Sequence, residues 1–122
     1  MDNGHRDNTF LVAAASTDCG YTVDVHFGRA GEFYIYRFAE GEWDYVEKRS
    51  VKPVCRGGSH SAPEMEQRIS LFQDCRYVIA SRIGIAAITL MSRKGITAMA
   101  LPGDLIEALK KIQTYDEIQS LF

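Results

Sequence analysis

Hydrophobic and polar positions along the chain follow two periods, one typical of strands and one typical of helices. Residues 10–15 form a short, continuous apolar run that ends at a polar turn, a pattern typical of a central strand buried on both faces. Residues 32–38 alternate as a strand rich in aromatic side chains, and residues 43–49 continue after a short turn in a more polar pattern. Together they predict a β-hairpin whose charged second arm suits an exposed sheet edge.

The second half of the chain alternates between helical and strand patterns. A first amphipathic helix is predicted after Ser61, a second over residues 85–94, and a third after Asp104. Short apolar runs at residues 77–80 and 96–101 predict the two strands that separate these helices.

The order of these elements predicts the fold class. Strands that are joined through helices run parallel with right-handed crossovers, and the hairpin adds antiparallel strands. We therefore expect an α/β fold with a five-stranded mixed sheet flanked by helices, in which the first and fourth strands are neighbours at the centre. Residues 1–8 are predicted to form a disordered N-terminal lead, and residues 9–122 are predicted to form a single domain.

Composition narrows the classes of function. The chain has 122 residues and a formal net charge of -2, which argues against nucleic-acid binding because phosphate neutralisation needs a concentrated basic face. No apolar run approaches the length that spans a bilayer, so no membrane partner is expected. Three widely spaced cysteines are typical of reduced thiols, and we therefore expect a cytoplasmic protein.

Three polar segments are predicted to meet at one edge of the sheet: residues 16–28, 51–60 and 81–84. Ligands in open α/β sheets usually bind beyond the carboxyl ends of the central strands. In the first segment, His26 can offer a neutral imidazole to a metal, and Asp24 could fix its tautomer. The alternative is a surface turn in which His26 hydrogen-bonds the backbone.

The second segment adds sulfur and a further imidazole. Cys55 could provide the thiolate that iron–sulfur clusters prefer, and His60 lies close to it in the sequence. Between them, Gly57 and Gly58 would allow backbone amides to approach an anion. The alternative is a flexible loop with an incidental thiol.

The third segment places Arg82 and Gly84 between a strand end and a helix start, where an anion would meet free N–H groups. The alternative for Arg82 is a salt bridge at the rim. Of the remaining cysteines, Cys19 is predicted to occupy a turn and Cys75 the core.

The motifs resemble those of a known family. An apolar strand ending in Ala-Ser-Thr-Asp is followed by Val-Asp-Val-His-Phe-Gly-Arg-Ala at residues 23–30, and later by Cys-Arg-Gly-Gly and Ser-Arg-Ile-Gly. In this order and at these spacings they are similar to the dinitrogenase iron–molybdenum cofactor biosynthesis family, which includes NifX-like carriers and the C-terminal domain of NifB. The resemblance extends from about Thr9 to Ile112.

The resemblance implies a ribonuclease H-like topology and a non-enzymatic carrier that transiently binds an iron–sulfur precursor of the iron–molybdenum cofactor. It implies that His26 contributes to cluster binding, with Cys55 as a second ligand. Because the clusters are anionic, Arg29, Arg56 and Arg82 would supply complementary charge. The expected partners are the donor and acceptor proteins of cofactor assembly, and the expected state is a monomer or weak dimer.

Three alternatives accompany this interpretation. A zinc site could be formed by Cys19, His26, Cys55 and His60, although the spacings are not those of the usual zinc knuckles. A metal-dependent nuclease would need converging carboxylates, for which Asp18 and Asp24 are the nearby candidates. An interaction module that uses the exposed hairpin would bind no metal.

Overall fold

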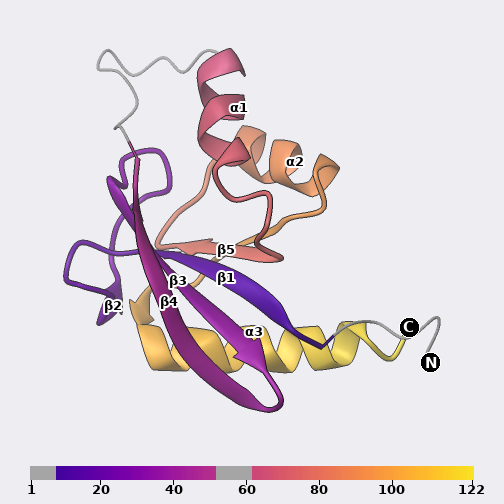
Figure 1. The fold of residues 1–122 in the computed structure, drawn as a ribbon. Helices are drawn as coiled ribbons and strands as arrows, with labels where there is room; N and C mark the ends of the chain where they lie inside the picture. Colours follow the sequence, from indigo (N-terminus) through magenta and orange to yellow (C-terminus); the bar gives the residue numbers. More distant parts are fainter. Residues whose placement is uncertain (1–7, 52–61) are drawn as a thin grey trace.

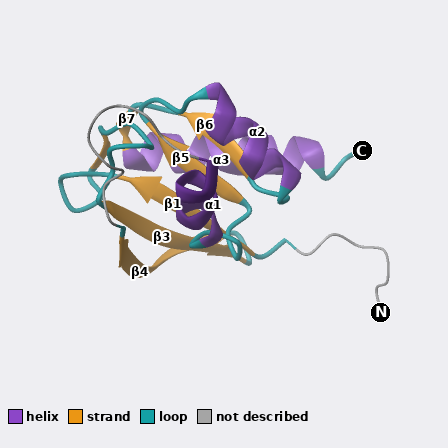
Figure 2. Cartoon of the chain, turned by 90° about the horizontal axis from the view of Figure 1, so that it is seen from above, coloured by secondary structure: helices purple, strands orange, loops and turns teal. Residues whose placement is uncertain are grey.

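A five-stranded mixed sheet forms the centre of the computed structural model, which describes residues 8–51 and 62–122. The strand order is β4-β3-β1-β5-β6 (Figures 1 and 2). Strand β1 runs antiparallel to β3 and parallel to β5, and β5 runs parallel to β6. The strands are β1 (Phe10–Ala15), β3 (Glu32–Ala39), β4 (Glu42–Ser50), β5 (Tyr77–Ala80) and β6 (Thr97–Ala100). The predicted α/β fold with a mixed sheet is confirmed, as is the pairing of the first predicted strand with the fourth.

Helices cover both faces of the sheet. Helices α1 (Ala62–Ser70) and α2 (Ile85–Arg93) lie on one face, and α3 (Leu105–Gln119) lies on the other (Figures 1 and 2). None of the helices in the part of the chain that the structure describes is long and apolar enough to cross a membrane.

Strand β1 is buried on both faces, as its unbroken apolar run predicts. Ala13 and Ala15 belong to the core beneath α1 and α2, whereas Val12 and Ala14 belong to the core beneath α3. Successive side chains of a strand point to opposite faces, so one apolar run serves two cores. Its small alanines leave room for the larger side chains that the helices contribute.

Aromatic rings fill both cores. On the α1 side, the ring centroid of Phe33 lies 4.5 Å from that of Phe72 and 5.7 Å from that of Phe27. On the α3 side, Trp43 contacts the rings of Phe10 and Phe38. The Phe27 ring is anchored in the first core, so the loop that carries it is fixed to the α1 face.

A second, two-stranded sheet was missed by the sequence patterns. Strand β2 (Thr22–Val23) pairs antiparallel with β7 (Gly103–Asp104), and the Leu105 amide donates to the Tyr21 carbonyl at 3.0 Å. The sequence around Gly103 reads as a turn only. Two-residue strands are too short to show a period.

The helix ends largely follow the predicted signals. Helix α2 ends at Arg93, and Gly95 adopts a left-handed φ of 83° while the Ile96 amide donates to the Met91 carbonyl. At the start of α3, the Asp104 carboxylate accepts from the Glu107 amide at 3.0 Å. The predicted N-cap Ser61 and the predicted lead, residues 1–8, lie outside the described residues except for Asn8.

Truncation of a core ring tests this account of the packing. Phe72 is fully buried, whereas its neighbour Leu71 is 45% exposed. We expect Phe72→Ala to lower the free energy of unfolding by about 3–5 kcal/mol, because it removes apolar burial and leaves a cavity. Leu71→Ala should change it by less than about 1 kcal/mol. Urea denaturation followed by circular dichroism measures both, and equal losses would contradict the assignment of the core.

Candidate functional site

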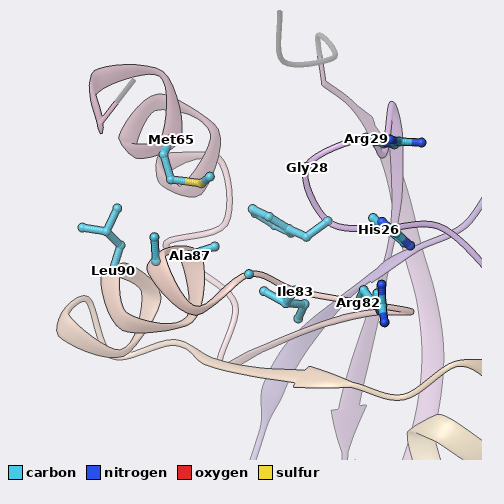
Figure 3. A pocket seen from close by; sticks show the side chains of 11 residues that line it. His26, Gly28, Arg29, Met65, Arg82, Ile83, Ala87 and Leu90 are labelled. Atoms are coloured by element: carbon cyan, nitrogen blue, oxygen red, sulfur yellow. The ribbon is translucent and has the colours of Figure 1, made fainter. Parts of the chain in front are cut away.

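A pocket of about 700 Å³ opens beside the carboxyl end of β5, between α1, α2 and the loop that follows β2. Figure 3 shows its two ends. Met65, Ala87 and Leu90 lie at one end, where α1 faces α2, and His26, Arg29 and Arg82 lie at the other. The lining is completed by Phe27, Gly28, Ile83, Gly84 and Ala86.

The basic end is open to solvent. The side chains of His26, Arg29 and Arg82 are exposed. Among residues 8–51 and 62–122, no carboxylate forms an ion pair with either arginine. One imidazole and two guanidinium groups thus line the same end of the pocket, which suits an anionic ligand.

Backbone hydrogen bonds attach the loop that carries His26 to the end of β5. The Phe27 amide donates to the Arg82 carbonyl at 2.9 Å, and the Ser81 amide donates to the Val25 carbonyl at 3.0 Å. His26 and Arg82 consequently form a parallel β-bridge. The two sequence motifs that carry these residues thus meet through their main chains.

A tight turn follows His26. The amides of Arg29 and Ala30 both donate to the His26 carbonyl at 3.0 Å, and the Phe27 side chain is 1% exposed. The turn thereby points its buried ring inward and leaves the flanking imidazole and guanidinium at the surface.

Two aspartates build the preceding segment of the loop. The Asp18 carboxylate accepts from the Thr22 amide at 2.9 Å, from the Thr22 hydroxyl at 2.6 Å and from the Ser16 hydroxyl at 2.8 Å. These hydrogen bonds, chiefly that from the Thr22 hydroxyl, lower the pKa of Asp18 to about 2.

The Asp24 carboxylate accepts from the backbone amide and the hydroxyl of Thr17. The prediction that Asp24 fixes the tautomer of His26 is therefore wrong, because its oxygens close the loop onto Thr17 instead. Both aspartates that the nuclease alternative required are thus engaged in holding the backbone of this loop.

Helix α2 begins at the pocket mouth. Gly84 is its N-cap residue, and the Ile88 amide donates to the Gly84 carbonyl at 3.0 Å. A glycine offers no side-chain acceptor, so the first-turn amides are left to solvent or a ligand. Its φ of -68° and ψ of 155° are open to any residue, and a Cβ built there meets nothing within 4 Å. The missing side chain therefore keeps the mouth clear and is not required by the backbone.

Comparison with known proteins identifies the family. The sequence profile described as "Dinitrogenase iron-molybdenum cofactor" matches residues 8–115. The chain belongs to the dinitrogenase iron-molybdenum cofactor family. The resemblance expected from the motifs is thus confirmed over nearly the whole chain.

Curated relatives in this family are longer proteins. NifB of Frankia alni, a FeMo cofactor biosynthesis protein, is 35% identical over 100 residues, which cover 80% of this chain and 19% of NifB. NifY of Klebsiella pneumoniae is 33% identical over 100 residues, which cover 80% of this chain and 42% of NifY. The chain therefore spans about a fifth of the NifB relative and less than half of NifY.

Solved structures share the fold. The crystal structure of PH0822 superposes with a TM-score of 0.64 at 22% identity, covering 85% of this chain and 88% of that one. The NMR structure of a NifB-like protein from Thermotoga gives a TM-score of 0.54 at 22% identity, covering 86% and 88% of the two chains.

In this member of the dinitrogenase iron-molybdenum cofactor family, the structure brings four of the predicted site residues together: His26, Arg29, Arg82 and Gly84. The others lie outside the described residues: Cys55, Arg56, Gly57, Gly58 and His60. Within residues 8–51 and 62–122, no three His, Cys, Asp or Glu side chains are grouped so that they could hold a metal ion.

The remaining cysteines lie away from the pocket lining. Cys19 is exposed in a turn with a φ of 63°. Cys75 is 3% exposed, and burial raises the pKa of its thiol to about 12, so it behaves as a core residue. Both positions agree with the turn and the core that the sequence predicts for them.

Sequence reasoning missed the apolar end of the pocket and one buried charge. Met65 and Leu90 read only as helix-face residues, because their meeting depends on how α1 packs against α2. Arg68 is 3% exposed on the buried face of α1. Its position on the apolar face of an amphipathic helix, one residue before Ile69, could have indicated from the sequence that this charge is buried.

The pKa of Asp18 provides a test of the loop. A carboxyl with a lowered folded-state pKa stabilises the fold at pH values above its unfolded pKa, and this contribution is lost as the pH falls through about 2. We expect the Asp18 carboxyl carbon to titrate near pH 2 by NMR. In Asp18→Asn, the decline of stability between about pH 4 and pH 2 should be shallower than in the parent. A midpoint near 4 would show that these hydrogen bonds do not form.

Proposed function

We propose that this chain is a non-enzymatic carrier that binds an iron–sulfur precursor of the iron-molybdenum cofactor and passes it to an acceptor protein. The observation that carries the proposal is the shared pocket mouth of His26, Arg29 and Arg82, which two separate sequence motifs form through a backbone bridge. Membership of a family described by this cofactor, and similarity to the FeMo cofactor biosynthesis protein NifB, support the choice of cargo.

The residue types suit such a cargo. The exposed imidazole of His26 can bind iron, and the guanidinium groups of Arg29 and Arg82 can donate charge-assisted hydrogen bonds to the sulfides of an anionic cluster. Cys55 and His60 remain predicted ligands, and Gly57 and Gly58 remain predicted contacts of the anion. These four residues lie outside the described part of the chain.

The apolar end of the pocket supports a sheltering role. Met65, Ala87 and Leu90 offer no competing hydrogen bonds, and an apolar surround limits the access of water to a metal centre. Solvent still reaches the His26 end, which leaves the cargo accessible to an acceptor.

The proposal also covers the topology, the cellular compartment and the partner proteins. We propose a ribonuclease H-like topology, supported by the order β4-β3-β1-β5-β6, in which the antiparallel hairpin of β3 and β4 lies beside the parallel strands β1, β5 and β6. We further propose that the protein works in the cytoplasm with donor and acceptor proteins of cofactor assembly, as a monomer or weak dimer.

Anaerobic titration with a synthetic four-iron, four-sulfur cluster capped by small thiolates tests the proposed ligands. We expect saturable binding in the parent and at least about tenfold weaker binding in His26→Ala and in Arg82→Met, because each removes a direct contact. Visible absorption and electron paramagnetic resonance follow the titration. Arg93→Met, at the far end of α2, is the matched control for loss of an arginine.

The outcomes of this titration are distinct. Parent-like affinity in both His26→Ala and Arg82→Met would sink the assignment of the pocket. Weaker binding in Cys55→Ala alone would move the site toward that residue. Stoichiometric zinc in protein purified without added metal, together with no cluster binding, would favour the zinc alternative.

Gly84 allows the pocket to be blocked without strain. The backbone there accepts any side chain, so Gly84→Leu should fill the mouth and abolish cluster binding while the fold stays intact. Ser92→Leu adds the same bulk to an exposed position near the end of the same helix and should bind as the parent does. Binding by Gly84→Leu at parent affinity, with an unchanged circular dichroism spectrum, would place the cargo elsewhere.

A further inference from the structure

Arg68 is a buried cation that connects α1 to the loop bearing His26. The residue is 3% exposed, and its neighbour Ile69 is fully buried in the aromatic core. Burial lowers the pKa of the guanidinium, which reflects the cost of removing a charge from water. A buried guanidinium needs hydrogen-bond partners that compensate for this cost.

Those contacts are made with the turn that follows His26. The Nη1 atom of Arg68 donates to the Ala30 carbonyl at 3.0 Å, and its Nη2 atom donates to the Gly28 carbonyl at 3.2 Å. The guanidinium carbon lies 5.5 Å from the centroid of the Phe27 ring. A single side chain thus holds the turn at two main-chain oxygens and stacks on its anchoring ring.

The geometry is specific to arginine. The two carbonyls belong to residues on either side of Arg29, so two donors in one rigid plane are needed to reach both. Lysine would bring a single ammonium group to this place and could not reproduce the fork. Methionine would fill much of the volume and donate to neither carbonyl.

The turn has an attachment on its other side as well. The Phe27 amide is bound to the Arg82 carbonyl at the end of β5, and the amides of Arg29 and Ala30 close onto His26. The loop is therefore held from the sheet by β5 and from α1 by Arg68. Met65, one turn before Arg68 on the same helix, lines the pocket.

We propose that Arg68 is a positioning residue that sets the orientation of the His26–Ala30 turn relative to α1, and thereby fixes the spacing between the basic and apolar ends of the pocket. Arg68 does not line the pocket and acts through the carbonyls of Gly28 and Ala30. Its bearing on cargo rests on the proposed carrier function, whereas its effect on the turn does not.

Hydrogen exchange measured by NMR on the cargo-free protein tests the positioning role directly. In Arg68→Met we expect the amides of Arg29 and Ala30 to exchange at least about tenfold faster, because the Gly28 and Ala30 carbonyls lose the side chain that holds them to α1. The amide of Ile79, in the central strand β5, reports global opening and should change much less. In Arg68→Lys, which keeps the charge but has a single donor nitrogen in place of the planar fork, the effect on the turn should be intermediate.

A matched control separates this role from general packing. Ile69→Val removes one methyl group from the same helix without touching either carbonyl, so it should change the Arg29, Ala30 and Ile79 amides in parallel. If Arg68→Met also changed them in parallel, or left the turn amides at the parent rate, the positioning role would be refuted. If Arg68→Met failed to fold, the Arg68→Lys comparison would decide on the same criterion.

The cluster titration then links position to cargo. With the same thiolate-capped cluster, we expect Arg68→Met to bind about tenfold or more weakly and to alter the electron paramagnetic resonance signal of the bound cluster, because a shifted imidazole changes the metal environment. Faster turn exchange with unchanged affinity and signal would overturn the link to cargo. If the parent bound no cluster, the carrier function would fail while the exchange result still decided the role of Arg68.

Discussion

The hydrogen bonds that attach the His26 loop to the end of strand β5 determine where the basic residues of the pocket lie. The main chain on either side of His26 is hydrogen-bonded to the end of β5, and β5 is itself paired with β1 and β6. A strand held on both sides is among the least mobile parts of a sheet. The loop therefore shares the rigidity of the sheet although it has little regular structure of its own. The main-chain positions of His26 and Arg82 are fixed relative to each other.

Much of this arrangement could be predicted from the sequence because it follows from periodicity and topology. The unbroken run at residues 10–15 indicated a strand buried on both faces, and the charged arm of the hairpin indicated an edge, where β4 lies. The rule that ligands gather at the carboxyl ends of strands predicted that His26 and Arg82 lie at the same edge of the sheet. Each of these inferences depends on local pattern plus one general rule.

What could not be predicted depends on contacts between distant elements. The partner of Asp24 is Thr17, and nothing in the spacing distinguishes that hydroxyl from the nearby imidazole. The apolar end of the pocket forms where α1 packs against α2, and the sequence of either helix alone does not determine how far apart the two helices lie. The pairing of β2 with β7 involves two residues on each side, below the length at which a strand shows a period. Arg68 was the exception, since a charge on an apolar helix face could have been noticed.

For the proposed carrier function, the exposure of the His26 imidazole has a kinetic consequence. A ligand buried behind a lid must release its metal before another protein can reach it, so transfer passes through free cargo. A ligand at an open mouth can instead share the metal with an incoming donor, and the old bond can break as the new one forms. The rate of such an associative exchange depends on the concentration of the receiving protein, not on spontaneous release. Under the proposed carrier function, the cargo would therefore pass from one protein to the next without being released free into solution.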